Sequence, residues 1–544
     1  MRHGTRLIAG GVLALVVCLG AACAGQKDTP GDANAPDTPS ALFATADSCS
    51  GCHDNLTDAA DRDISFVNAW STSVHSYASV DPYYLATVSH ESELLPDSAD
   101  VVQTTCATCH LPMANITARE TGASGAFLGE GASSADSSLH ALYRDAVSCL
   151  VCHQIAPEGL DTDAAASGGF KIDTTTGGLR TLYGQFALSD AMQTVMENAI
   201  GYTSVQSDHV ASSELCATCH TLYTQPVGTD GALMDIAFPE QVPYLEWQQS
   251  SLAQTSSCQS CHMPSSASTM ISTLSEETRD AARIHSFTGG NVFLLNLMTA
   301  DADTDAAAAA SNGIASTTEL LETQTASLTV TAERSGDVIT VTVTVNNLAG
   351  HKLPTAFPSR RAWLHVSATG ASDGALINSG SWNSDGSIVG NDNDDDAAAF
   401  EPHYTVISAN DQVQIYESIL GDSSGGVTTS VMAATGYLKD NRLLPLGFDK
   451  AATPADTSVA GGALADADFT GGQDTVTYRF PAPQANGYPV VVTVELLYQP
   501  VGYRWLENLR GVGTQESDAL FASANANTSA IAPVAIAVRE VQVP

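Results

Sequence analysis

The stretch Cys149-Leu150-Val151-Cys152-His153 decides the fold, because two cysteines three positions apart are followed at once by a histidine. The same C-x-x-C-H pattern recurs, and its five copies occupy residues 49–53, 106–110, 149–153, 216–220 and 258–262. Two thiols at this spacing on a tight turn can each bond one vinyl group of a porphyrin, and the adjacent histidine then lies beneath the ring as an iron ligand. The sequence therefore predicts five covalently bound c-type haems.

The residues expected to hold these haems follow directly from the motifs. The attachment cysteines are Cys49, Cys52, Cys106, Cys109, Cys149, Cys152, Cys216, Cys219, Cys258 and Cys261. The proximal iron ligands are His53, His110, His153, His220 and His262.

Zinc binding is the main alternative to haem attachment at C-x-x-C pairs, but a zinc site does not require a histidine after every second cysteine. Five pairs also cannot be matched two by two into tetrahedral sites. A redox-active C-x-x-C pair is expected once in a chain and not five times. The two remaining cysteines, Cys18 and Cys23, lie near the N-terminus, so no cysteine is left over for a structural disulfide.

Six-coordinate haems need a second axial ligand, and histidines outside the motifs can supply it. The expected distal ligands are His75, His140, His209, His285 and His351. His285 opens the segment His285-Ser-Phe-Thr-Gly-Gly-Asn291, whose glycine pair we expect to let the backbone run close to a porphyrin. His90 is a further candidate, whereas His365 points from a predicted strand and is expected to be structural. Met113 and Met263 follow their motifs closely, and they either ligate iron through sulfur or pack on a porphyrin.

The N-terminus predicts export. Arg2 and Arg6 precede an apolar run over residues 7–19 and small residues around Cys23, which is the layout of a secretory signal. We expect a signal peptide over residues 1–22 and a flexible tether over residues 23–45, with a periplasmic or cell-surface product. Cys23 is a candidate for lipid attachment, and simple cleavage to a soluble product is the alternative.

The remainder of the chain divides into regions that differ in composition and in the periodicity of apolar residues. Residues 46–300 carry all the motifs among short helical stretches and Gly/Ser loops, which predicts a mainly α, loop-rich multihaem cytochrome c domain. Residues 301–327 are expected to form a helical connector. Residues 328–544 alternate between apolar and polar side chains, as in Val338-Ile-Thr-Val-Thr-Val-Thr-Val345. Such runs, bounded by Gly, Asn and Asp, predict an all-β, sandwich-like domain.

Charge limits the partners. The formal net charge is -39, so nucleic acid and anionic lipid surfaces would repel the chain, whereas basic redox proteins would be attracted. Solubility alone is an equally good explanation of this charge. The acidic run over residues 391–396 has oxygen ligands that suit calcium, and a solvated charged loop is the alternative.

With these residues in view, the chain resembles bacterial multihaem cytochromes c of the nitrifier tetrahaem type, extended by a C-terminal β domain. The likeness rests on residues 145–153, 214–222, 243–247, 258–264, 285–291 and, in the β region, 350–363. The resemblance implies closely packed haems that relay electrons. It also places other multihaem cytochromes among the expected redox partners. No C-x-x-C-K motif is present, unlike in pentahaem nitrite reductases, and octahaem hydroxylamine oxidoreductases need three more motifs.

Two functions remain. The sequence favours an electron relay, which needs no substrate pocket. The alternative is a multihaem reductase of a small nitrogen or sulfur oxyanion, in which one haem lacks a distal ligand. With only 21 Lys and Arg against 60 Asp and Glu, attraction of an anion is disfavoured.

Overall fold

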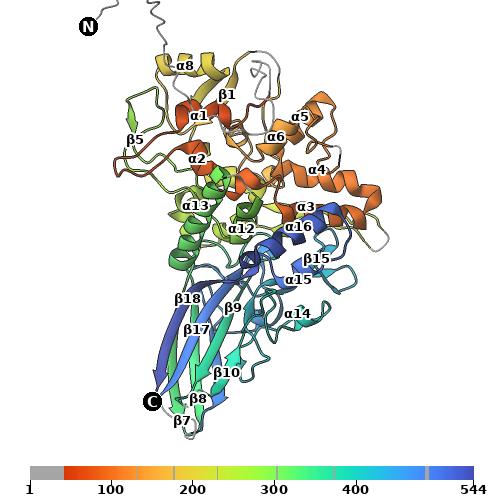
Figure 1. Ribbon diagram of the computed structural model, residues 1–544, viewed down its shortest axis with the longest axis vertical. Helices are drawn as coiled ribbons and strands as arrows, with labels where there is room; N and C mark the ends of the chain where they lie inside the picture. The colour runs from red at the N-terminus through yellow and green to blue at the C-terminus, as the bar shows by residue number, and fades with distance from the viewer. Residues whose placement is uncertain are drawn as a thin grey trace, which may run out of the picture. The chain divides into compact units, whose positions relative to one another are not determined.

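Helices dominate the chain up to residue 325, and strands dominate after it (Figure 1). The computed structural model describes residues 42–129, 131–175, 178–228, 231–301, 304–371, 374–483 and 489–544, which belong to one compact unit. The expected signal peptide, Cys18, Cys23 and most of the expected tether lie outside the described residues. Within the described ranges, no helix combines the length and the apolarity needed to cross a bilayer.

The helical region, residues 42–325, consists of short helices joined by loops. They are α1 (Asp47–His53), α2 (Phe66–Ser71), α3 (Pro82–Leu94), α4 (Ala99–His110), α5 (Pro112–Thr121), α6 (His140–Arg144), α7 (Cys149–Cys152), α8 (Asp190–Ile200), α9 (Ser213–His220), α10 (Pro243–Gln248), α11 (Cys258–His262), α12 (Val292–Asp301) and α13 (Thr304–Leu320). The five motifs lie on α1, α4, α7, α9 and α11, and each helix ends at or just before the motif histidine. Helical geometry therefore holds both thiols and the imidazole of each motif close together.

Small strand pairs tie the loops of this region. Strand β1 (Arg180–Gly184) runs parallel to β2 (Tyr202–Gln206), whereas β3 (Leu222–Thr224) pairs antiparallel with β4 (Phe238–Gln241), and β5 (Thr269–Met270) with β6 (Thr278–Arg279). Helix α3 begins at a proline, and the preceding Asp81 accepts the amide of Tyr83 at 2.9 Å as an N-cap.

The strand-rich region, residues 326–544, is built on two main sheets. Its elements are β7 (Ala326–Ser335), β8 (Val338–Asn347), β9 (Arg361–Thr369), β10 (Ala375–Ser379), α14 (Asp392–Asp395), β11 (Val406–Ile407), β12 (Ile415–Tyr416), β13 (Ser418–Asp422), β14 (Val427–Thr428), β15 (Ala434–Asp440), β16 (Gln473–Pro481), β17 (Val490–Gln499), α15 (Tyr503–Glu507), α16 (Gln515–Ala526) and β18 (Val534–Val543). One sheet has the order β10-β9-β17-β18, with β12 added to β9, and the other has the order β11-β16-β8-β7. The sequence prediction of β-sheets after the helices is thus confirmed.

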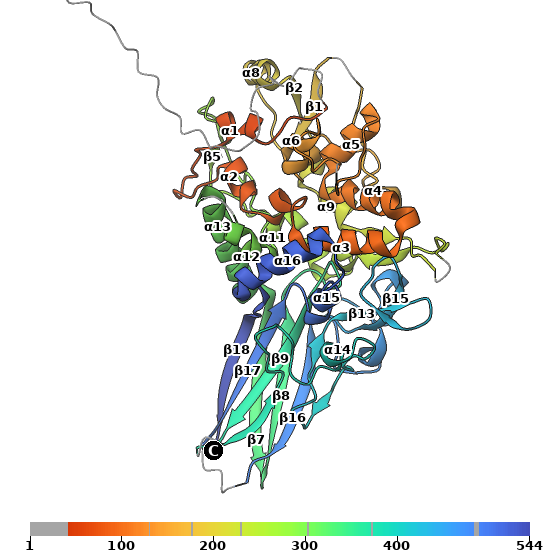
Figure 2. The same ribbon diagram turned by 45° about the vertical axis from the view of Figure 1, so that its right-hand side comes forward.

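The two sheets share one apolar core (Figure 2). Every second residue of β8 is buried, namely Ile339, Val341, Val343, Val345 and Asn347. This period of two is what a strand with one face on a core requires. A third, smaller sheet has the order β14-β13-β15.

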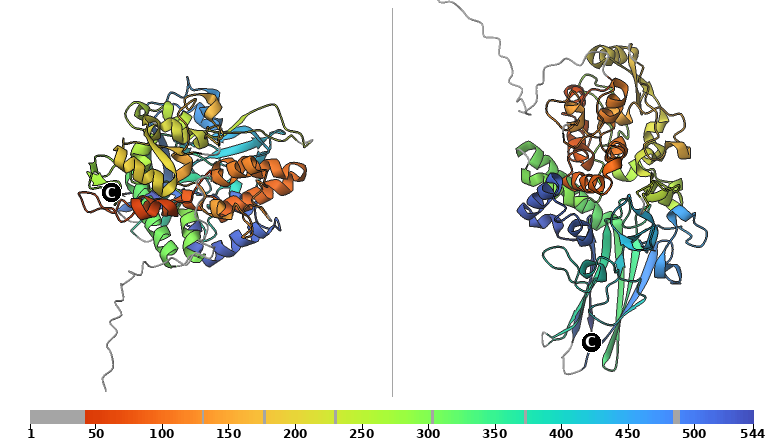
Figure 3. Two further views of the ribbon diagram at one scale, coloured as in Figure 1. Left: turned by 90° about the horizontal axis from the view of Figure 1, so that it is seen from above. Right: turned by 90° about the vertical axis from the view of Figure 1, so that its right-hand side faces the viewer.

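C-terminal helices join the strand-rich region to the helical one. Tyr83 of α3, Phe293 of α12 and Leu520 of α16 belong to a single apolar cluster. Figure 3 shows α15 and α16, in blue, against the first helices and against α12 and α13. The carboxylate of Glu91 on α3 also accepts the amide of Val431 at 3.0 Å. The strand-rich region therefore packs directly on α3 and α12 of the helical region.

Candidate functional site

Thiols of different motifs contact one another. The thiols of Cys49 and Cys149 lie close enough to shift each other's pKa, as do those of Cys109 and Cys219, and of Cys216 and Cys258. Cys152 also lies close enough to Cys219 to interact electrostatically. The first motif therefore adjoins the third, and the fourth adjoins the second, third and fifth, so that all five form one cluster.

Three of the motif histidines face a histidine from elsewhere in the chain. The imidazole centres of His153 and His285 are 6.2 Å apart, and their planes differ by 18°. His262 and His351 are 6.3 Å apart with planes within 9°. His220 and His75 are 6.2 Å apart at an interplanar angle of 55°. Three of the five predicted distal ligands thus lie opposite a predicted proximal ligand.

These separations fit two imidazoles bound to opposite faces of one iron. Since a metal–imidazole bond is about 2 Å long, the ring centres of two trans ligands stand roughly 6 Å apart. Rings in direct stacking contact come much closer, as Tyr84 and His110 do at 3.7 Å. The three pairs therefore have the geometry of bis-histidine haem ligation.

Hydrogen bonds decide which ring nitrogen is available to a metal. Where Nδ1 lies against a carbonyl oxygen, it must carry the proton, because a carbonyl only accepts, and Nε2 keeps a free lone pair. Among the described residues, seven predicted ligands have this arrangement, with Nδ1 2.6–3.1 Å from the oxygen: His53, His110, His140, His153, His262, His285 and His351. The backbone thus prepares these imidazoles to bind iron through Nε2.

Burial favours the neutral form of several paired imidazoles. Loss of solvent lowers the pKa of His75 and of His285 to about 4, and that of His220 to about 3. The same effect lowers the pKa of His351. Because only the neutral imidazole binds a metal, these sites favour ligation over protonation at neutral pH.

Two motif histidines have different surroundings. In the part of the chain that the structure describes, no second imidazole stands at the pair separation from His53 or His110. The ring nearest to His53 is Phe66, at 6.0 Å, and that ring lies 5.0 Å from His285. His110 stacks on Tyr84 with the planes within 1°.

Two predicted distal ligands stand apart from the pairs. His140 lies 6.2 Å from the ring of Tyr143 and faces no motif imidazole. Both nitrogens of His209 are engaged, with Nδ1 2.7 Å from Ser207 Oγ and Nε2 2.9 Å from the carbonyl of Ile155. For both residues, ligation of iron remains a prediction. The contacts of the two ring nitrogens do not favour it for His209.

The other candidates have local roles. His365 bonds to Glu495 at 2.8 Å and to Asn378 at 2.9 Å, as a structural histidine does. The sulfur of Met113 lies 3.8 Å from Ser148 Oγ, inside an apolar cluster. One glycine of the pair after His285 lies against a tyrosine, since a Cβ at Gly290 would lie 2.8 Å from the hydroxyl of Tyr498, and the expected approach of the backbone to a porphyrin stays a prediction. The lack of a side chain at Gly290 therefore makes room for Tyr498 of β17.

Sequence reasoning missed the aromatic side chain that separates two distal ligands. Phe287 lies 4.8 Å from His75 and 5.8 Å from His285, measured between ring centres. Its φ of 43° is a left-handed conformation that turns the chain sharply after His285. Its place inside the His285 segment was the signal that could have identified it.

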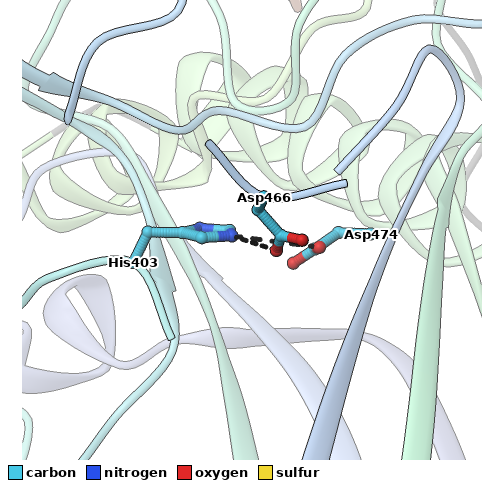
Figure 4. Close-up of side chains that lie close together, drawn as sticks. All are labelled: His403, Asp466 and Asp474. Carbon is cyan, nitrogen blue, oxygen red and sulfur yellow. Dashed lines mark hydrogen bonds and ion pairs between the residues drawn. The ribbon is translucent and has the colours of Figure 1, made fainter. Parts of the chain in front are cut away.

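A second group of potential metal ligands lies in the strand-rich region, where His403, Asp466 and Asp474 converge (Figure 4). His403 Nε2 is 3.0 Å from Asp466 Oδ2 and 4.0 Å from Asp474 Oδ1. All three side chains are largely withdrawn from solvent. Distance alone would allow a bound cation.

The protonation of His403 argues against a metal. Its Nδ1 accepts from the amide groups of Gln414 at 2.9 Å and Asn441 at 3.1 Å. Both amides are held in this orientation, because their oxygens accept backbone N–H groups. Nε2 therefore carries the ring proton and donates it to Asp466, while burial raises the pKa of Asp474 to about 7. The cluster is a buried hydrogen-bond network.

The acidic run over residues 391–396 is organised by arginines. Arg361 Nη1 lies 2.8 Å from Asp394 Oδ1, and Arg504 donates to the carbonyls of Asn393 and Asp394. Asp392, Asp395 and Asp396 are exposed. The arginine side chains thus donate hydrogen bonds to buried oxygens of the run. Calcium binding at the exposed carboxylates stays a prediction.

Comparison with known proteins gives a match of fold. No family model matches the chain, and no curated protein matches it. The crystal structure of a penta-heme cytochrome c552 from Thermochromatium tepidum matches with a TM-score of 0.50 and 17% identity, over 92% of this chain and 100% of that chain. The finer resemblance to the nitrifier tetrahaem type stays a prediction. The chain therefore has a multihaem cytochrome c-like fold.

Proposed function

We propose that this chain is an exported multihaem c-type cytochrome that relays electrons through five covalently attached haems. The observation that carries the proposal is the spacing of three imidazole pairs, 6.2–6.3 Å between ring centres, with a motif histidine in each pair. The C-x-x-C-H motifs and the likeness in fold to a penta-heme cytochrome support it independently.

Each haem would be held by the two cysteines and the histidine of its motif. His285 would supply the second ligand to the third haem, His75 to the fourth and His351 to the fifth. A haem so ligated supplies an iron that cycles between the ferric and ferrous states. The role of the chain is to fix the imidazoles, keep them neutral and exclude water.

The contacts between motifs support a branched relay. Cys49 meets Cys149, Cys152 lies near Cys219, and the fourth motif meets both the second and the fifth. Electrons would therefore pass in the order first, third, fourth and fifth, with the second haem as a side branch at the fourth. Each difference of about 59 mV between neighbouring sites changes a one-electron equilibrium tenfold, so modest tuning gives direction.

Partners and location follow as parts of the proposal. The net charge of -39 favours basic redox proteins or basic faces of other multihaem cytochromes and disfavours nucleic acid. The product would be periplasmic or at the cell surface, with Cys23 as a candidate lipid anchor.

The surroundings of His53 and His110 leave a second candidate function to be tested, that of an oxyanion reductase. Within the described ranges neither ring has another imidazole at the pair separation, so one of these haems would be the place for an external ligand. The scarcity of basic residues weighs against an anionic substrate.

A redox experiment separates the two functions. The exported holoprotein, reduced in excess donor, should pass about five electrons per chain to an oxidised basic cytochrome in stopped flow. The same reduced protein should not be reoxidised by nitrite or sulfite. Rapid reoxidation by either anion, with turnover, would replace the relay by the reductase.

A further inference from the structure

A buried carboxylate joins the helical region to the loop that carries His351. Glu246 lies on α10 and has no exposed surface. Its Oε2 accepts the backbone amide of Lys352 at 3.1 Å and the hydroxyl of Thr355 at 2.5 Å. One side chain of the helical region thus holds the segment that directly follows His351.

A chain of ion pairs repeats this connection. Glu246 Oε1 lies 3.0 Å from Arg442 Nη1, and Arg442 binds both oxygens of Asp440, at 2.9 Å and 2.8 Å. Asp440 in turn pairs with Lys352 Nζ at 2.7 Å. Two acidic and two basic groups therefore balance one another in the interior, where any single uncompensated charge would be strongly destabilising.

The same lysine fixes the imidazole. The carbonyl of Lys352 accepts the Nδ1 proton of His351 at 2.8 Å, which sets both the tautomer and the rotation of the ring. Glu246 holds the amide of this residue, and Asp440 holds its ammonium group. Movement of Lys352 would therefore move the ring that faces His262.

Helix α10 also contacts the segment that leads into the fifth motif. Trp247, next to Glu246, donates its indole N–H to the carbonyl of Ser256 at 3.0 Å, two residues before Cys258. A Cβ at Gly350 would lie 3.3 Å from Trp247 Cδ1, so the loop before His351 rests on the same indole. One helix thus contacts both sides of the His262–His351 pair.

We propose that Glu246 is the positioning residue for the second axial ligand of the fifth haem. It acts through Lys352, by holding the His351 loop of the strand-rich region against the helix that precedes the fifth motif. This inference rests on the proposed function, because it needs His351 to ligate iron. It adds that a residue of the helical region controls a ligand donated by the strand-rich region.

The test compares the holoproteins of three variants by electron paramagnetic resonance and carbon monoxide titration. His351→Ala is the reference, and it should convert one haem per chain to a high-spin, CO-binding form. Glu246→Ala should reproduce this conversion at the same haem, and added imidazole should restore the low-spin signal. Glu417→Ala removes a buried carboxylate that pairs with Lys439 at 2.9 Å outside the ion chain, and it should leave all haems unchanged.

The outcomes are distinct. If Glu246→Ala adds no high-spin haem to those of the wild type while His351→Ala adds one, Glu246 has no positioning role. If His351→Ala also changes nothing, the ligand assignment itself fails, and the inference fails with it. Should Glu246→Ala not fold, Glu246→Gln keeps the shape of the side chain but removes its charge opposite Arg442. That variant should bind CO at one haem at least tenfold faster than the wild type, and an unchanged rate would overturn the proposal.

Discussion

The imidazole of His351 lies 6.3 Å from that of His262 and within 9° of parallel, although the two residues belong to the strand-rich and the helical region. Both rings direct Nδ1 to a backbone carbonyl, Lys352 in one case and Thr288 in the other. The haem site predicted at the fifth motif is thus completed only when the two regions pack together.

Intact-mass spectrometry should find five haem additions on the exported chain. Replacing Cys258 and Cys261 together with alanine should remove one addition, because thioether bonds form only at these thiols of the fifth motif. Four or fewer additions on the wild-type chain would refute the count.

The substitution His285→Ala should leave one haem without its second axial ligand. His285 faces His153 at 6.2 Å, so its loss should leave the third haem with one imidazole and convert about one fifth of the haem to a high-spin, CO-binding form. Magnetic resonance and CO difference spectra measure this change. His365→Ala, on a histidine bonded to Glu495 and Asn378, is the matched control and should have no such effect.

His75→Ala should act on a different haem. Its partner is His220, so the fourth haem, at the branch of the proposed relay, should become open. In the double variant with His285→Ala, two more high-spin haems per chain than in the wild type are expected, because the pairs are separate. If the double variant gains only one high-spin haem, as either parent does, the pairing given above is wrong.

Two buried carboxyl groups should contribute less stability as the pH rises. Burial raises the pKa of Asp474 and of Glu240 to about 7, so the folded chain holds protons that the unfolded chain releases near pH 4. The stability from each group is therefore full below about pH 4 and is lost as pH rises through about 7, at up to about 1.4 kcal/mol per pH unit. The buried histidines, whose pKa values are lowered, act in the opposite direction, so the contribution of one carboxyl is measured as a difference. Thermal unfolding followed by circular dichroism should show that the Tm of Asp474→Asn rises relative to that of the wild type between pH 5 and pH 8. A Tm difference that does not change with pH would exclude Asp474 as a contributor.

Chelation should leave the strand-rich region unchanged. Because His403 Nε2 donates to Asp466, the cluster in Figure 4 needs no cation for its stability. Treatment with EDTA should shift the Tm by less than about 1 °C, and metal analysis should find iron in haem and no stoichiometric zinc. A large drop in Tm that calcium reverses would instead point to the exposed carboxylates of residues 391–396.

The sequence predicted what depends on neighbours along the chain. The C-x-x-C-H spacing identifies thiols and a histidine that one helical turn brings together, and alternation over β8 identifies a strand with one buried face. The pairing of His75 with His220 depends instead on the packing of distant loops. His209 was expected to ligate, yet its two nitrogens meet Ser207 and Ile155, a contact that no local pattern encodes.

Residues that position others were also out of reach. Glu246 belongs to the segment Pro243-Tyr-Leu-Glu-Trp247, which marked the resemblance to multihaem cytochromes but gave no role to its carboxylate. Its role depends on Lys352 and Arg442, which lie far away in sequence and reach it only through the packing of the two regions. Phe287 and the carbonyls that orient the imidazoles are further examples of contacts made across the fold.

The contacts between thiols of different motifs constrain how the chain matures. Cys49 meets Cys149, Cys109 meets Cys219, and Cys216 meets Cys258. In an oxidising compartment, free thiols in contact are converted to disulfides, which would cross-link the motifs in the wrong combination. In the cytochrome proposed above, every one of these thiols would be taken up in a thioether bond, and attachment before the chain folds would keep the three pairs from cross-linking.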